Sequence, residues 1–373
     1  MAIHSLLQCR TWSKSDWLIA SIGIVLMCFP FLSLSIRLQT LSPPLILKTE
    51  ELFAWMEACL VITFIRGGGG CRTIESCSSR AMTRLGSSNF FEHEVPFQGV
   101  LSSDPSQNPD FFNWNRIMIR YCDGACFSGH PEAEFKLIWE TIMDELLSMG
   151  MSHAKHAILT GCSAGGLATL IHCDYFRDHL PNDATVKCVS DGGYILNLPD
   201  VLGNPTMGSF FHDVVTLQRV DRSLDQNCVA KMEPSKCLFP QESLKNIRTP
   251  VFLVNTAYDY WQIQNGLVPD SPNLDERWAI CRLNIQECDA AQMKVLHGFR
   301  SSLIDAIGEF HENKEGGMFI NSCNSHCQIR ESWHSPTSTR IENKTIAESV
   351  GDWYFNRKPV KLIDCPYPCN TSC

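Results

Sequence analysis

Short runs of apolar, often β-branched residues recur along the chain and alternate with stretches whose apolar residues stand three or four positions apart. The short runs predict buried strands, and the wider spacing predicts one apolar face of a helix. We expect strands at residues 59–65, 116–121, 157–159, 186–189, 251–254 and 318–320. We expect helices from residue 135 to a stop at Gly150, at residues 167–177 and at residues 295–310.

Strands that alternate with helices predict an α/β fold with a mostly parallel sheet and helices on both faces. Two stretches interrupt this rhythm. Residues 72–113 are polar and rich in turn formers, which favours a long loop with short helices, and residues 195–245 show no regular pattern. Because the chain contains no internal repeat, we expect a single domain over residues 61–373.

The N-terminal part differs from the rest of the chain. Residues 17–36 carry no charge and follow Arg10 and Lys14. This run is long for the apolar core of a signal peptide and is about long enough to span a bilayer. We therefore interpret residues 1–36 as a signal peptide or an uncleaved signal anchor. Residues 37–60 then form an atypical N-terminal segment, and the remainder faces the secretory lumen.

Composition supports this placement. The chain has 19 cysteines among 373 residues, and only Cys9 and Cys28 precede residue 37, which leaves 17. Zinc-binding spacings are absent, so the cysteines favour disulfides in an oxidising compartment, with Cys71 and Cys77 as a plausible local pair. An odd count leaves at least one thiol outside intramolecular pairs.

Charge and short motifs add two further predictions. A net charge of −9 without a Lys/Arg-rich run excludes a nucleic-acid binder with a basic stripe. The triplets at Asn343 and Asn370 match N-glycosylation sites, which fits a secreted glycoprotein.

The sequence Gly161-Cys162-Ser163-Ala164-Gly165 follows a predicted strand and precedes a predicted helix. Gly-x-Ser-x-Gly in this context is typical of a nucleophile elbow, a turn so sharp that bulky neighbours would clash. The turn exposes the serine hydroxyl at the carboxyl end of the sheet. A structural glycine turn is the alternative interpretation.

A serine nucleophile needs a histidine base and an acid that orients it, and in this fold they follow in the order serine, acid, histidine. Asp191 and Asp259 each come directly after a predicted strand. The later position is the usual one for the acid, so Asp259 is favoured over Asp191 on this logic, and both remain open.

Four histidines lie downstream of Asp259. We expect His297 and His311 on a helix, as surface or capping residues, and His334 in a turn. His326 lies in a loop after a short predicted strand, between Cys323 and Cys327, where disulfides would hold it in place. His326 is therefore the preferred base.

Residues 67–70 are four consecutive glycines directly after the first predicted strand. Glycines allow the backbone to approach a ligand closely. We expect the backbone N–H groups of Gly69, Gly70 and Ala164 to form an oxyanion hole. A flexible linker is the alternative.

Several long motifs occur in one order, and together they make the chain from about residue 61 resemble the plant pectin acetylesterases, a family that also resembles the animal Wnt deacylase Notum. The motifs are Thr83-Arg84-Leu85-Gly86-Ser87-Ser88, Asn108-Pro109-Asp110-Phe111 with Asn113-Trp114-Asn115-Arg116, Arg120-Tyr121-Cys122-Asp123-Gly124, Gly161-Cys162-Ser163-Ala164-Gly165-Gly166-Leu167-Ala168, Asn255-Thr256-Ala257-Tyr258-Asp259 with Trp261-Gln262-Ile263, and Asn321-Ser322-Cys323 with His326-Cys327-Gln328.

This resemblance implies a disulfide-stabilised α/β-hydrolase fold, secretion to the cell wall and hydrolysis of acetyl esters on pectin. It implies the catalytic triad Ser163, Asp259 and His326. The implied partners are acetylated pectin and water, without an obligate protein partner, and neither a metal nor an organic cofactor is implied.

The chain departs from the family pattern near its start. Arg66 stands where the family has glutamate, and Gly70 stands where it has tryptophan. The upstream Cys-Leu-Asp-Gly-Ser segment of the family is not found in residues 36–60, so Cys59 is a candidate to replace the usual partner of Cys122. Two alternatives follow: an esterase for another acyl group, as in Notum, and a catalytically impaired binder of wall polysaccharide.

Overall fold

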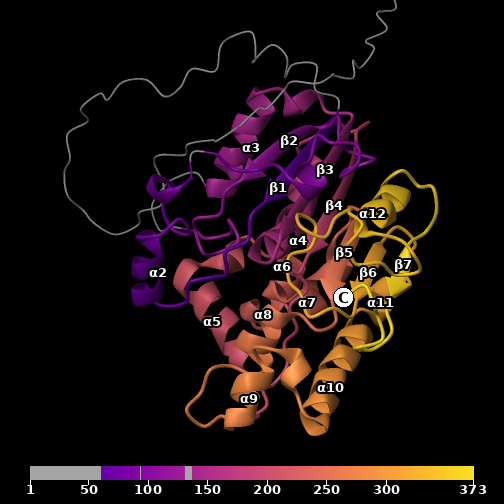
Figure 1. The fold of residues 1–373 in the computed structure, drawn as a ribbon. Coiled ribbons are helices and arrows are strands. Elements are labelled where there is room, and N and C mark those ends of the chain that lie inside the picture. The colour runs from indigo at the N-terminus through magenta and orange to yellow at the C-terminus, as the bar shows by residue number, and fades with distance from the viewer. Residues whose placement is uncertain (1–59, 93, 131–136) are drawn as a thin grey trace, which may run out of the picture.

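The computed structural model describes residues 60–92, 94–130 and 137–373, and its centre is one parallel sheet (Figure 1). Seven strands lie in the order β2-β1-β3-β4-β5-β6-β7, and every neighbouring pair is parallel. The strands are β1 (Leu60–Ile65), β2 (Asn115–Ile119), β3 (His156–Cys162), β4 (Thr185–Asp191), β5 (Val251–Thr256), β6 (Gly317–Asn321) and β7 (Lys361–Ile363).

Helices of unequal length connect these strands. The longer ones are α2 (Ile74–Ala81), α3 (Ile138–Ser148), α4 (Ala164–Asp178), α5 (Thr206–Gln218), α10 (Ala290–Ala306) and α12 (Ile346–Tyr354). The shorter ones are α6 (Gln226–Val229), α7 (Pro240–Ser243), α8 (Tyr260–Gln262), α9 (Glu276–Cys281) and α11 (Gly308–His311).

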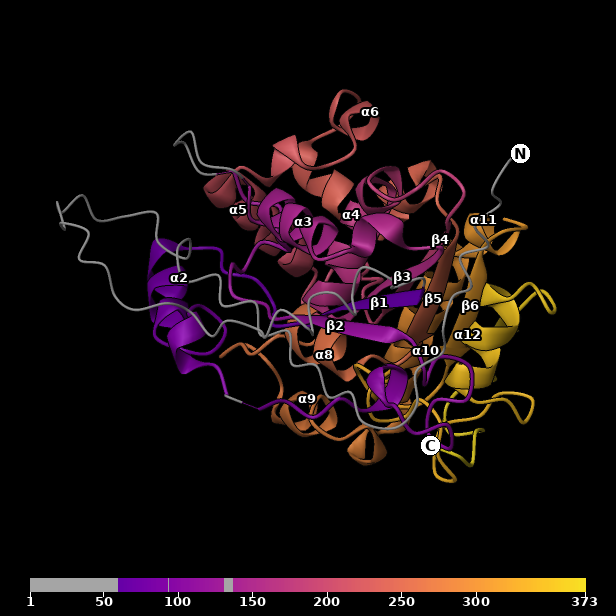
Figure 2. The ribbon, with the colours of Figure 1, turned by 90° about the horizontal axis from the view of Figure 1, so that it is seen from above.

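Two apolar layers cover the two faces of the sheet. Helices α3, α4, α5 and α10 contribute to the larger layer, and α12 with loop residues such as Trp114 and Trp333 builds the smaller one. Figures 1 and 2 show α3 and α4 on one side of the strands and α12 on the other. Successive strand residues alternate between the layers, as the period of two requires: Val61 and Ile65 join the larger layer, and Ile62 and Phe64 the smaller. The expected α/β fold with covered faces is confirmed.

The backbone is packed most tightly where β3 turns into α4. A Cβ atom on Gly161 would lie 2.4 Å from the carbonyl oxygen of Gly165, and one on Gly165 would lie 2.2 Å from the carbonyl oxygen of Ile65. Such distances leave no room for a side chain. The glycines that flank Ser163 therefore allow β1, β3 and α4 to meet.

All six predicted strands are present, with boundaries shifted by a few residues. The structure corrects the expectation for residues 195–245, which contain α5, and it adds β7 and α12. Helix α4 starts at Ala164 rather than at residue 167 because it begins directly after the elbow. Helix α10 starts at Ala290 because Asp289 caps it, accepting hydrogen bonds from the backbone N–H groups of Ala291 and Gln292.

Disulfides link the described part of the chain at seven places. The predicted pair Cys71–Cys77 is confirmed. The others are Cys162–Cys327, Cys173–Cys188, Cys228–Cys237, Cys281–Cys288, Cys323–Cys373 and Cys365–Cys369. A disulfide-rich domain is the expected outcome for an oxidising compartment.

The interpretations of residues 1–36 and 37–59, and the candidate partner Cys59, lie outside the described residues. Among the described residues, no helix is long and apolar enough to cross a membrane.

The tight turn after β3 generates a first prediction. Gly165→Ala places a methyl group against two backbone carbonyls, so we expect the free energy of unfolding to fall by at least the roughly 1–3 kcal/mol typical of overpacking. Gly298→Ala in α10 is the control, because a Cβ there meets nothing within 4 Å. It should raise the free energy of unfolding by about 0.5–1 kcal/mol. Urea unfolding measures both, and equal effects of the two variants would contradict the packing argument.

Candidate active site

Ser163 occupies a strained position between the end of β3 and the start of α4. Its backbone angles are φ 58° and ψ −126°, in the left-handed range that L residues rarely adopt. The Ser163 N–H donates to the carbonyl oxygen of Asp191 at 2.8 Å, which ties the turn to β4. Backbone strain at a single residue is typical of a functional site. The predicted elbow geometry is therefore present, and the Ser163 side chain lines a cavity.

His326 and Asp259 lie beside this turn and contact each other. His326 Nδ1 is 2.6 Å from Asp259 Oδ2, and both side chains are buried. Asp259 Oδ1 accepts a hydrogen bond from the Gln262 N–H at 3.0 Å, so the carboxylate is fixed in place. The ring of Trp261 stacks on His326 with an interplanar angle of 18° and also lines the cavity with Ser163. These contacts leave His326 Nε2 as the free end of the ring, buried and without a hydrogen-bond partner in the described chain.

The protonation of His326 depends on opposing effects. Burial alone would lower its pKa, but the nearby carboxylates of Asp259 and, more weakly, Asp191 raise it above the usual value of 6.5. A buried imidazole next to a carboxylate is thus a stronger base than a free one. It can take a proton from a hydroxyl and keep the resulting charge stabilised.

The loop that carries His326 is covalently attached to the turn that carries Ser163. Cys162 precedes the serine, Cys327 follows the histidine, and these two cysteines form a disulfide with their Cα atoms 5.3 Å apart. The bond therefore joins the immediate chain neighbours of both side chains. It holds the two loops together at the carboxyl end of the sheet.

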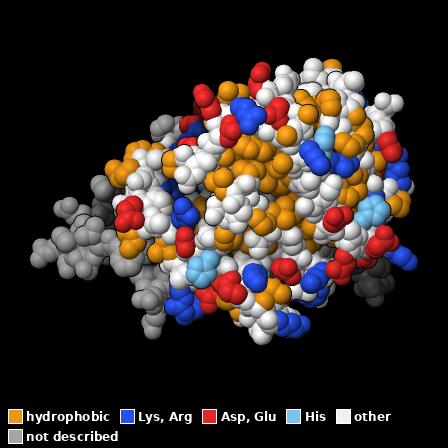
Figure 3. All heavy atoms as spheres, turned by 90° about the horizontal axis from the view of Figure 1, so that it is seen from below, with side chains coloured by type: hydrophobic (Ala, Val, Ile, Leu, Met, Phe, Trp, Pro, Cys, Tyr) orange, Lys and Arg blue, Asp and Glu red, His pale blue; other side chains and the backbone are white. Residues whose placement is uncertain are grey.

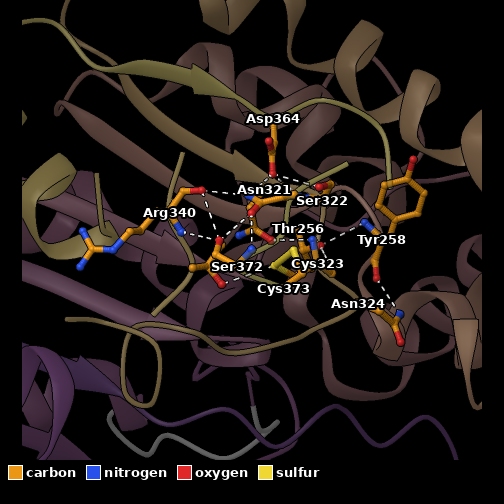
Figure 4. The surroundings of a disulfide bond; sticks show 12 residues. Thr256, Tyr258, Asn321, Ser322, Cys323, Asn324, Arg340, Asp364, Ser372 and Cys373 are labelled. Atoms are coloured by element: carbon orange, nitrogen blue, oxygen red, sulfur yellow. Dashed lines mark hydrogen bonds between the residues drawn. A yellow bond between two sulfur atoms is a disulfide. The ribbon is translucent and has the colours of Figure 1, made fainter. Parts of the chain in front are cut away.

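The other side of the same loop is anchored to the C-terminal tail (Figure 4). Cys323 forms a disulfide with Cys373, and its carbonyl oxygen accepts a hydrogen bond from the Thr256 hydroxyl. The Asn324 side chain donates to the carbonyl oxygen of Tyr258 at 3.0 Å. The base of the loop is therefore tied to the end of β5, directly before Asp259.

Asp191 has a different position from Asp259. Its Oδ2 atom accepts hydrogen bonds from the backbone N–H groups of Gln328 at 2.5 Å and Ile329 at 2.9 Å. Burial raises the pKa of Asp191 to about 7, although these two N–H groups counteract that effect. Of the two acids that the sequence left open, Asp259 contacts the His326 ring, and Asp191 holds the backbone that follows it.

The other three histidines have separate surroundings. His297 Nδ1 lies 2.8 Å from the Tyr258 hydroxyl, and His334 Nδ1 lies 3.0 Å from the Thr345 hydroxyl. His311 is exposed at the end of α11. None of these contacts involves Ser163.

Gly69, Gly70 and Ala164 line the same cavity as Ser163. Gly69 has φ +65°, and its carbonyl oxygen accepts a hydrogen bond from the Tyr121 hydroxyl at 2.7 Å. This bond orients the glycine loop. The three residues proposed to supply oxyanion donors therefore line the same cavity as the serine.

The cavity is small and apolar. Its volume is about 30 Å³, which is room for about two water-sized groups. The remaining lining residues are Gly124, Ala125, Cys126, Leu167, Ile195, Phe210, Phe211, Val214, Leu238 and Trp261. Figure 3 shows hydrophobic side chains gathered in the middle of the face seen from below, with charged side chains towards its margin. Helices α5, α8 and α9 lie at this end of the molecule in Figure 1.

Sequence reasoning missed the wall that α5 contributes. Phe210, Phe211 and Val214 lie in the stretch that we expected to be irregular. The spacing of Met207, Phe211 and Val214 by four and three residues is the signal that would have identified this helix.

The two predicted glycosylation sites differ in their surroundings. Asn343 is exposed in a turn with φ 62°. The side-chain amide of Asn370 instead donates to the carbonyl oxygen of Arg340 at 2.9 Å and to Asp364 at 2.6 Å. Glycosylation at both positions stays a prediction, and Asn343 has the more accessible amide.

Comparison with known proteins gives a consistent result. The family profile described as Pectinacetylesterase matches residues 57–373. Pectin acetylesterase 4 of Arabidopsis thaliana is 78% identical in an alignment 410 residues long, which covers all of both proteins. Pectin acetylesterase 5 of the same plant is 65% identical in an alignment 415 residues long, which covers 99% of this chain and 97% of that protein. The human palmitoleoyl-protein carboxylesterase NOTUM is 26% identical over 84% of this chain and 66% of its own length.

Solved structures support the fold. A crystal structure described as the Wnt deacylase Notum from Drosophila superposes with a TM-score of 0.69 at 22% identity, covering 85% of this chain and 91% of that one. At this identity the likeness concerns the fold alone. The profile match and the two plant relatives go further, and by them this chain belongs to the pectinacetylesterase family.

Proposed function

We propose that the protein is a secreted serine esterase that removes acetyl groups from cell-wall pectin (homogalacturonan) and releases acetate. The observation that carries this proposal is the small apolar cavity that Ser163 lines beside the buried His326–Asp259 pair. The names of the plant relatives supply the polysaccharide. The seven disulfides found among the described residues fit the oxidising conditions outside the cell.

In this proposal Ser163 Oγ attacks the acetyl carbonyl carbon while His326 Nε2 takes the serine proton. Asp259 holds the ring through Nδ1 and stabilises its positive charge. The N–H groups of Gly69, Gly70 and Ala164 stabilise the oxyanion of the tetrahedral intermediate. His326 then gives the proton to the departing sugar oxygen, which leaves an acetyl-serine.

The second half of the cycle repeats these roles with water. His326 Nε2 takes a proton from a water molecule whose oxygen attacks the acetyl-serine carbonyl carbon. The ester bond to Ser163 breaks, the serine oxygen regains the proton from His326, and acetate leaves. No atom or electron from a further group is needed.

The cavity and the relatives together favour an acetyl group. The cavity is small and apolar, which suits the methyl group of an acetyl ester, whereas a long acyl chain needs apolar volume for many methylene groups. The names of the two plant relatives likewise favour acetyl esters over the longer acyl group of a Notum-like deacylase. The alternative of a non-catalytic binder gives no reason for the fixed His326–Asp259 contact.

A first test of the proposal measures acetate release from acetylated pectin. The wild-type protein should release acetate and prefer acetyl over long-chain esters. Ser163→Ala should reduce kcat by about 10⁴–10⁶, because only binding and the oxyanion hole would remain. His334→Gln is the control and should keep its activity, since the His334 ring contacts the Thr345 hydroxyl and does not line the cavity that contains Ser163. A Ser163→Ala protein with near-normal activity would contradict the mechanism.

The raised pKa of His326 predicts the pH dependence of the reaction. The base must be neutral, so kcat/KM should fall as the pH drops through a pKa above 6.5 and should level off at higher pH. Asp259→Asn removes the main cause of the raised pKa and should lower kcat by roughly 10⁴. Asp191→Asn keeps a side-chain carbonyl oxygen that can accept from the N–H groups of Gln328 and Ile329, so its kcat should fall far less. The pH–rate profiles of the wild type and the two variants provide the check. A larger loss of kcat in Asp191→Asn than in Asp259→Asn would mean that Asp191 is the acid that supports the base.

The disulfide between the serine turn and the histidine loop predicts a kinetic defect when it is removed. Cys162→Ala with Cys327→Ala should lower kcat by about 10²-fold, the typical effect of a 1 Å misplacement of reacting groups. Cys281→Ala with Cys288→Ala removes another disulfide, between α9 and the following turn, and serves as the control. Both proteins are compared well below their melting temperatures. Equal kcat values for the two double variants would show that the bond stabilises the fold without positioning the site.

A further inference from the structure

Two arginines extend from adjacent strands at the same register. Strands β1 and β2 pair in parallel with Ile65 opposite Ile119, and the Arg66 N–H donates to the carbonyl oxygen of Ile119 at 3.0 Å. Figure 2 shows these two strands side by side. Ile65 and Ile119 both face the larger apolar layer, so Arg66 and Arg120, one position further, extend towards the opposite face.

The guanidinium of Arg120 is almost completely buried but only partly bonded. Its side chain is 9% exposed and lies 4.0 Å from the ring of Phe91. Nη1 donates to the carbonyl oxygen of Glu92 at 2.6 Å. Nε and Nη2 have no hydrogen-bond partner in the described chain, and the Glu92 carboxylate comes no closer than 4.0 Å. Buried polar groups are normally hydrogen-bonded, so these free donors require an explanation.

A third arginine joins the pair from the loop that follows His326. Arg330 Nη2 donates weakly to the carbonyl oxygen of Pro96 at 3.4 Å, and its buried Nε has no partner in the described chain. Burial first, and then the charge of Arg66, lowers the pKa of Arg330. The same two causes lower the pKa of Arg120. The charge of Arg66 therefore acts on both Arg120 and Arg330, and one loop lies against both of these, with Phe91 at the Arg120 guanidinium and Pro96 at that of Arg330.

Nearby acids do not balance this charge. Glu92 pairs with Arg84 at 3.1 Å and is half exposed, and Glu331 is exposed. Arg120 and Arg330 thus carry buried donors without partners in the described chain, Arg66 adds a third positive charge, and the half-exposed Glu92 is the acid at ion-pair distance from Arg120. Such a cluster attracts an anion, above all a planar carboxylate.

This cluster adjoins the proposed esterase centre. Arg66 directly precedes Gly67, and a Cβ on Gly67 would lie 2.7 Å from Cβ of Ser163. Arg330 follows Gln328 and Ile329, whose N–H groups bind Asp191 beside the histidine loop. A substrate that places its ester at Ser163 therefore has other parts of the same molecule within reach of the cluster.

We propose that Arg66, Arg120 and Arg330 form a subsite for a uronate carboxylate of the polysaccharide that is deacetylated. This inference rests on the proposed function, because it assigns to the same site a polyanionic chain whose sugar rings carry both esters and carboxylates. The carboxylate would supply acceptors for the unbonded Nε and Nη2 donors and relieve the repulsion among the arginines. Substrate charge, in addition to acyl size, then determines specificity.

The test compares acetylated oligogalacturonide with the same oligosaccharide after chemical reduction of its carboxylates to alcohols. Wild-type protein should show a markedly lower KM for the charged form, and salt should weaken that preference. Arg66→Gln and Arg330→Gln should each reduce the ratio of kcat/KM values, charged over reduced, by about tenfold or more, the typical effect of losing a charge-assisted hydrogen bond. Arg277→Gln, on the exposed helix α9, makes the same charge change elsewhere and should leave the ratio unaltered.

Arg66→Glu distinguishes a role of Arg66 in substrate binding from a role in the stability of the fold. A glutamate beside Arg120 would supply the missing counter-charge, so the melting temperature of the free protein should rise while the affinity for unacetylated oligogalacturonide, measured by calorimetry, should fall. An unchanged preference in the arginine variants, or an equal change in Arg277→Gln, would overturn the subsite. Binding of oligogalacturonide that depends on Arg66 in a protein without acetate release would instead retain the subsite and overturn the proposed reaction.

Discussion

The structure depends on the close approach of three backbones around Ser163. The end of β1, the end of β3 and the first turn of α4 come so near one another that Gly67, Gly161 and Gly165 have no space for a Cβ atom. This packing holds Ser163 in a backbone conformation that L residues rarely adopt, and it places the glycine loop and the start of α4 beside the same cavity. The same packing therefore determines both the fold at this point and the geometry of the site, and a looser turn would disrupt both.

The parts of this arrangement that follow from local pattern could be predicted from the sequence. Six strands are visible as short apolar runs because both of their faces are buried, and the elbow is visible because steric need restricts its residues to glycine. The motifs around Asp259 and His326 favoured those two residues, and the structure brings them into contact. Strand β7 is three half-buried residues long, too short for any pattern to mark.

Other features depend on pairings between residues that are far apart in the chain. A cysteine does not specify its partner, so the sequence indicated disulfides but not that Cys162 joins Cys327 across 165 residues. The role of Asp191 could not be predicted either, since a carboxylate that follows a strand can orient a histidine ring or accept hydrogen bonds from backbone N–H groups. The arginine cluster arises only when β1, β2 and the loop after β6 meet.

The bond between Cys162 and Cys327 also has a consequence for the response of the protein to proteolysis. A protease that cuts the chain once between Ser163 and His326 produces two polypeptides, yet the disulfide keeps the C-terminal fragment, which contains His326, joined to the N-terminal fragment, which contains Ser163. The connecting segments after β4 and after α8 lie in this interval. A cut there leaves the Ser163 turn and the His326 loop in one covalent molecule, so their connection does not require an intact backbone.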